Sequence, residues 1–99
     1  MPDMLKTISL HHFSPLVGER FTVHTAHGTE TWTLLEANAS RYSGMGRTEP
    51  FSLIFQGPRH DTPTQSLYRL EHPSLEALEM FLVPIAATAN GVQYQAIFN

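Results

Sequence analysis

The chain has 99 residues, with 6 Lys and Arg side chains against 9 Asp and Glu and no cysteine. This length is typical of one domain with one hydrophobic core, so we expect a single β domain over residues 1–99, with residues 1–7 loosely ordered. The net charge of -3 argues against a nucleic-acid partner and against binding to an anionic membrane. The absence of cysteine excludes disulfides, thiolate metal sites and thiol nucleophiles.

The N-terminal segment does not have the pattern of a signal peptide. Residues 1–6 lack the apolar stretch of roughly 7 to 15 residues that a signal peptide needs. The longest apolar run, at residues 80–83, is far shorter than the roughly 20 residues of a spanning helix. We therefore expect a cytoplasmic protein.

Residues 9–18 predict a short N-terminal helix. Ser9 occupies the position of an N-cap, Leu10 and Phe13 lie one turn apart, and Gly18 stands where a chain reversal would end the helix.

After this helix the apolar period changes to two. Phe21 and Val23 alternate with polar residues, and Trp32 and Leu34 do the same further on, which is typical of half-buried strands. Gly28 lies between the two runs and can adopt a positive φ, so the sequence predicts a β-hairpin with its turn near this residue.

Two long connections flank the next predicted strand. Residues 40–49 contain two glycines and no period, which predicts a loop longer than the usual four to six residues. Phe51, Leu53 and Phe55 then share one face and predict a central strand. Residues 56–65 contain two prolines and a glycine, which predict a second long connection.

The segment from residue 71 to residue 85 is apolar on both faces of a predicted strand. Leu78, Met80 and Leu82 alternate with Phe81, Val83 and Ile85. One face can cover the core, while the other receives the N-terminal helix or a partner chain. Phe81 is therefore a candidate binding residue.

The remaining turns and strands complete the predicted fold. Alternation over residues 66–71 predicts a strand, Pro73 and Ser74 suit a turn, and Asn90-Gly91 predicts a reversal before the last strand at residues 92–99. The fold class is thus mainly β: a six-stranded antiparallel small barrel or sandwich with a short N-terminal helix. Besides one face of the segment just described, its predicted core is Phe21, Val23, Trp32, Leu34, Phe51, Leu53, Phe55, Tyr68, Leu70, Tyr94 and Phe98.

Five segments also carry a resemblance to a known family. They are F-S-P-L-V-G-E-R-F at 13–21, E-P-F-S-L-I-F-Q-G-P at 49–58, Y-R-L-E-H-P at 68–73, L-E-M-F-L-V-P-I at 78–85 and Y-Q-A-I-F-N at 94–99. The chain resembles a family of small bacterial domains of unknown function, often encoded beside proteins similar to phage tail-collar or tail-fibre components. The resemblance implies an accessory or assembly role and supplies no catalytic residues. Ser66 and Glu76 depart from it, since glycine is more usual there.

Histidine and carboxylate side chains are expected to gather at one end of the sheet. In a simple meander, the connections at one end would bring together His27, Arg59, His60, Asp61 and Asn90. Imidazole and carboxylate groups that converge can bind a metal or perform acid–base chemistry, so His27, His60 and Asp61 are candidate metal ligands. A solvated polar rim is the alternative.

No motif of a common enzyme class occurs in the sequence. G-x-S-x-G, H-E-x-x-H and a phosphate-binding glycine loop are all missing, and we expect no cofactor. His72 precedes Pro73 in the turn before the segment that is apolar on both faces, and we expect its ring to bond a backbone carbonyl rather than to act in catalysis.

A binding function draws on other residues. The loop at 40–49 offers Arg41, Tyr42, Met45 and Arg47, which are residue types favoured in interface cores. An exposed edge of an unclosed sheet is a second route. We therefore favour a non-enzymatic protein-binding or assembly module, with a protein partner or a homo-oligomer. The alternative is a small metal-binding or hydrolase-like enzyme that uses the His and Asp residues at one loop end.

Overall fold

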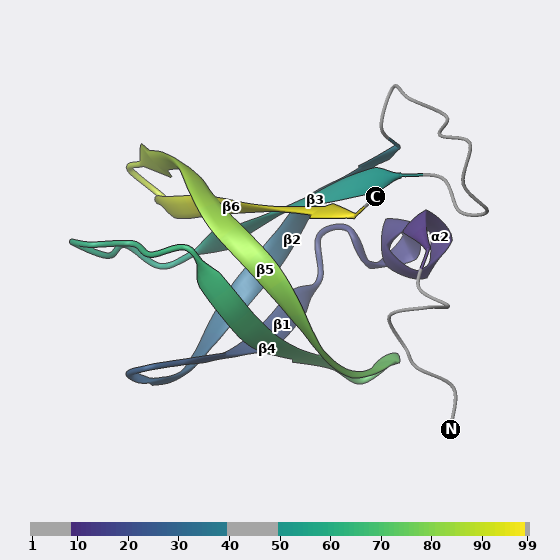
Figure 1. Cartoon of the computed structure of the whole chain (residues 1–99), viewed down its shortest axis with the longest axis horizontal. Coiled ribbons are helices and arrows are strands. Elements are labelled where there is room, and N and C mark those ends of the chain that lie inside the picture. Colours follow the sequence, from purple (N-terminus) through teal and green to yellow (C-terminus); the bar gives the residue numbers. More distant parts are fainter. Residues whose placement is uncertain (1–8, 40–49, 99) are drawn as a thin grey trace.

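The computed structural model describes residues 9–39 and 50–98. In this part of the chain a short helix precedes a closed antiparallel barrel of six strands (Figure 1), as the sequence predicts. The elements are α2 (Leu10–Phe13), a 3₁₀ turn η1 (Ser14–Leu16), β1 (Arg20–Thr25), β2 (Gly28–Ala39), β3 (Phe51–Gly57), β4 (Ser66–His72), β5 (Leu75–Thr88) and β6 (Gly91–Phe98). Within the described residues, no helix is long and apolar enough to cross a membrane.

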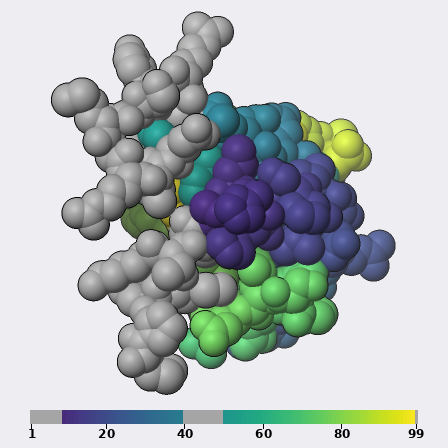
Figure 2. Space-filling view, turned by 90° about the vertical axis from the view of Figure 1, so that its right-hand side faces the viewer, coloured from purple at the N-terminus to yellow at the C-terminus, as the bar shows by residue number. Residues whose placement is uncertain are grey.

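The helical segment closes one end of the barrel. Ser9 is the N-cap of α2, and Gly18 follows η1 with a φ of 91°, both as predicted. Phe13 is fully buried, and its ring centroid lies 5.9 Å from that of Phe51 and 6.2 Å from that of Phe98. Figure 2 looks onto this end, where α2 lies in the centre in purple above the β4–β5 turn in green. The helix therefore plugs the barrel end and leaves Phe81 exposed.

The order of strands around the barrel is β1-β2-β3-β6-β5-β4. β3 pairs with β6 and β1 pairs with β4, so the simple meander assumed from the sequence is wrong. The expected open edge is also wrong, because the ring of pairs closes. β3 and β4 lie opposite each other in this ring, so the chain between them, residues 58–65, crosses the barrel end that α2 leaves open.

Two long strands turn the sheet around the core. β2 pairs with β1 up to Thr33 and with β3 from there onward, with an irregularity between Leu34 and Glu36. β5 pairs with β4 up to Leu82 and with β6 from Val83. Each of these two strands therefore pairs with one neighbour along its first part and with another along its second part.

The barrel interior holds one hydrophobic core. Every residue of the predicted core is buried except Phe98, which is partly buried. Leu78, Met80 and Leu82 point inward, whereas Phe81 and Ile85 are exposed. The inward side chains at the open barrel end and the outer face around Phe81 are therefore the two candidate regions for a functional site.

Candidate functional site

A cavity of about 210 Å³ lies at the barrel end that residues 58–65 cross. Inward-facing positions of the strands form its walls, and the β3–β4 connection covers it. The lining residues that matter most are Glu30, Trp32, Tyr68 and Tyr94 from the strands and His60 and Thr64 from the connection.

Glu30 places a half-buried carboxylate at this end of the barrel. Side chains of a strand alternate between its two faces, and Glu30 shares its face with Trp32 and Leu34, both of which are buried. The Trp32 Nε1–H donates to Glu30 Oε1 at 2.9 Å. Glu30 is absent from the residues predicted from the sequence, although a charge in phase with two core residues was the available signal.

Three aromatic rings pack together beside the carboxylate. Trp32 stacks on Tyr94 with ring centroids 4.1 Å apart, and its centroid lies 5.1 Å from that of Tyr68. The Tyr68 hydroxyl donates to the Thr64 carbonyl oxygen at 2.7 Å, which ties the covering connection to β4. A Cβ added to Gly57 would lie 2.8 Å from the Trp32 ring, so the glycine makes room for the indole.

The Tyr94 side chain is largely buried, and its hydroxyl lacks a hydrogen-bond partner within the described protein. The residue is 3% exposed and lines the cavity. Among the described residues, no protein group forms a hydrogen bond with its hydroxyl. Burial raises the pKa of Tyr94 to about 12, and Tyr68 and Glu30 add to the effect. The hydroxyl therefore keeps its proton and faces the cavity as a donor.

The histidine cluster expected from the sequence lies at the entrance. The ring centroids of His27 and His60 are 5.7 Å apart. Both rings line a wider groove of about 520 Å³ with Arg59 and Asp61, and this groove shares Glu30 with the cavity. The structure thus brings four of the five expected residues together. Asn90, the fifth, instead accepts a hydrogen bond from Gln56 Nε2 through its backbone oxygen, at 2.9 Å.

Metal binding by His27, His60 and Asp61 stays a prediction. Over residues 9–39 and 50–98, no three His, Asp or Glu side chains are grouped so that they could hold a metal ion. His60 Nδ1 accepts the N–H of Thr62 at 3.1 Å. A neutral His60 ring therefore carries its proton on Nε2 and offers no lone pair there.

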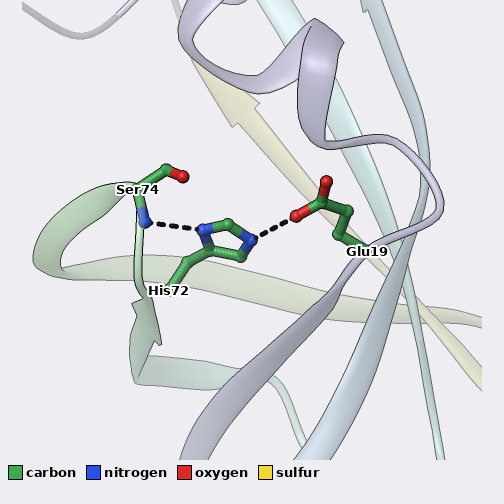
Figure 3. A network of polar contacts seen from close by, with 3 residues as sticks. All are labelled: Glu19, His72 and Ser74. Carbon is green, nitrogen blue, oxygen red and sulfur yellow. Dashed lines mark hydrogen bonds and ion pairs between the residues drawn. The ribbon is translucent and has the colours of Figure 1, made fainter.

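His72 has both ring nitrogens engaged (Figure 3). Nδ1 accepts the N–H of Ser74 at 2.9 Å, and Nε2 lies 2.7 Å from Glu19 Oε1. The expected bond to a backbone carbonyl is therefore wrong, because the turn directs an N–H toward the ring. With its side chain 5% exposed and no ring nitrogen free, His72 is a structural residue rather than a general base.

The outer surface of β4 and β5 carries a second candidate region. Leu67 and Phe81 are opposite each other in the strand pair and are 63% and 50% exposed. Arg69 and Glu79 form the next outward pair and are also exposed. We call these four residues the β4–β5 face. The sequence identified Phe81 but not Leu67, which alternates out of phase with the buried Tyr68.

The other predicted binding residues cannot be placed in this way. Arg41, Tyr42, Met45 and Arg47 lie outside the residues that the structure describes.

Comparison with known proteins gives one match. No curated protein and no solved structure matches the chain. A family model described as "Domain of unknown function (DUF6916)" matches residues 8–98. These residues include α2 and all six strands of the barrel, which agrees with the expected resemblance to a domain-of-unknown-function family. The chain therefore belongs to the DUF6916 family.

Proposed function

We propose that this domain is a non-enzymatic assembly module that binds a second copy of itself through the β4–β5 face. The observation that carries the proposal is the exposed pair of Leu67 and Phe81, which are neighbours across two strands. Exposed apolar side chains that cluster, rather than lie scattered, are typical of interaction surfaces. An aromatic residue at the centre of such a surface is a frequent source of binding energy.

Charge complementarity favours a second copy as the partner. In a two-fold interface the same surface is used twice, so residue i contacts residue j of the second copy and j contacts i. Arg69 and Glu79 lie opposite each other beside the apolar pair. A two-fold arrangement can therefore place Arg69 of each copy against Glu79 of the other while the apolar pairs meet at the centre.

The resemblance noted from the sequence supports an assembly role. It is to stand-alone bacterial proteins encoded beside proteins similar to phage tail components. Within this proposal the self-associated domain acts in the cytoplasm as an accessory to tail-like structural proteins.

A charge-swap experiment tests the proposed pairing. Arg69→Glu makes the face acidic and Glu79→Arg makes it basic, so like charges should prevent each variant from associating with itself. Mixing the two variants restores opposite charges only between copies, and sedimentation velocity should then show a heterodimer. A mixture that stays monomeric while the wild-type chain forms dimers would refute the two-fold pairing.

The apolar pair is tested separately. We expect Phe81→Asp to abolish self-association, because it places a charge at the centre of the interface. Val17→Asp is the matched control, since Val17 is also exposed but lies beside η1, away from the β4–β5 face. Wild-type protein that remains a monomer up to millimolar concentration would overturn the proposed function.

A further inference from the structure

We propose that the cavity at the barrel end binds a small organic cation with an ammonium or guanidinium head group, and that Glu30 is its counter-ion. The cavity lies inside the barrel end, whereas the β4–β5 face lies on the outer wall. The two proposals therefore depend on different residues, and either can fail without the other.

The charge of the cavity selects a cation. Glu30 is the one carboxylate among the described residues that line the cavity, and no Lys or Arg side chain lines it. Within the described part of the chain, the Glu30 side chain accepts a hydrogen bond from the Trp32 Nε1–H alone, on Oε1. Among the described residues, Oε2 of this half-buried carboxylate has no protein partner, so it can accept a charge-assisted hydrogen bond from a cation.

The aromatic walls favour the same kind of ligand. Ring faces of tryptophan and tyrosine attract cations within about 6 Å of the ring centroid, and Trp32, Tyr68 and Tyr94 all line the cavity. Trp32 and Tyr94 each use one ring face for the stack between them. The unpartnered Tyr94 hydroxyl adds a polar group that a substituent on the cation can engage.

The size of the cavity limits the ligand. Its volume of about 210 Å³ is several times the roughly 30 Å³ that one water occupies in the liquid. It is also below the roughly 300 to 1,000 Å³ of pockets that hold drug-sized molecules. A head group with a short substituent fits this range, and the groove beside His27 and His60, which shares Glu30, provides the way in.

The chain contains its own reporter for a binding experiment. Trp32 is the only tryptophan, and its Nε1–H bonds to the proposed counter-ion. Methylguanidinium and methylammonium are titrated against the Trp32 indole NMR signal and the fluorescence. N-methylurea, a neutral analogue of methylguanidinium, and acetate are the controls. We expect a saturable change with both cations and none with the controls.

Two substitutions locate the site. Glu30→Gln keeps an oxygen for the Trp32 Nε1–H but removes the charge, and should weaken cation binding about tenfold or more, the usual effect of losing one charge-assisted hydrogen bond. Tyr94→Phe should weaken it less. Glu36→Gln makes the same change of charge at an exposed position of β2 and should leave binding unchanged.

The outcomes decide the proposal. It is overturned if neither cation gives a saturable change, if N-methylurea binds as tightly as methylguanidinium, or if folded Glu30→Gln binds like the wild-type chain. Should Glu30→Gln fail to fold, the wild-type preference for methylguanidinium over N-methylurea together with the loss in Tyr94→Phe still decides between binding and no binding.

Discussion

His72 pairs through Nε2 with the carboxylate of Glu19, 53 positions earlier in the sequence, at a distance of 2.7 Å. Glu19 directly precedes β1, and His72 is the last residue of β4. These strands meet through Thr22, Val23 and His24 of β1, the shortest of the six strand pairings. The Glu19–His72 pair thus links β1 and β4 next to the shortest strand pairing of the barrel.

Substitutions at His72 should separate the contributions of its two hydrogen bonds to the free energy of unfolding. His72→Ala loses both bonds and leaves a cavity beside the Phe21 ring, whose centroid lies 4.8 Å from that of His72. We therefore expect a loss of about 2 to 4 kcal/mol in the free energy of unfolding. His72→Asn keeps an acceptor for the Ser74 N–H and should lose less. Urea unfolding measures both, and an equal loss for the two variants would show that the bond to Ser74 contributes nothing.

Gly91 is required both for its backbone conformation and for space. Its φ is 138°, and a Cβ there would overlap the Gly57 carbonyl oxygen. Gly28 has a φ of 121° but open space around it. We expect Gly28→Ala to cost about 1 kcal/mol, as strained glycine sites do, and Gly91→Ala to cost clearly more. Thermal unfolding of the two variants compares them, and equal losses would contradict the proposed overlap.

Tyr94 should make the stability fall in strongly alkaline solution. Its pKa is about 12 in the folded protein against 10.0 for the free side chain. Between these two pH values the unfolded chain releases the proton and the folded chain keeps it. Deprotonation therefore stabilises the unfolded state, and the free energy of unfolding falls as pH rises. Below pH 10 the effect is absent.

The matching measurement uses Tyr94→Phe. Urea unfolding from pH 9 to 12 should show a smaller decrease for this variant than for the wild-type chain. An unchanged slope would mean that Tyr94 does not titrate abnormally.

The last strand should be indispensable. β6 pairs with β3 on one side and β5 on the other, and it contributes the buried Tyr94 and Ala96. Deletion of residues 93–99 opens the barrel and exposes core side chains, so we expect the cooperative thermal transition to disappear. A truncated chain with a native-like melt in circular dichroism would contradict this prediction.

Zinc should bind weakly or not at all at the barrel entrance. His60 would have to give up its bond with the Thr62 N–H before Nδ1 could carry the proton and Nε2 could bind a metal. We therefore expect the His27 and His60 NMR signals to stay in place when Zn²⁺ is added below millimolar concentration. A tight, saturable shift of both signals, lost in His60→Ala, would instead establish the metal site predicted from the sequence.

The strands and the core could be predicted from the sequence, because alternation reports directly which side chains are buried. Phe21, Val23, Trp32 and Leu34 illustrate this, since their period alone placed them in the core. The order of strands could not be predicted, because alternation within β3 does not specify that its second neighbour is β6.

Some residues of the candidate sites could also be predicted, because they depend on local sequence patterns alone. Phe81 stood out as an apolar residue on the second face of its strand, and His27 and His60 follow from the turns. To predict Glu30 as a site residue requires two facts: Glu30 lies on the same strand face as Trp32, and the chain crosses this barrel end without filling it. The second fact arises from the strand order, which a local pattern does not contain.

The path of residues 58–65 across the barrel has a consequence for how such a domain can diversify. This connection covers the cavity but takes part in none of the strand pairs that close the ring. Substitutions and changes of length are best tolerated in such segments. Recognition at the cavity can therefore be altered in one short stretch of sequence, while the scaffold and its folding information stay the same.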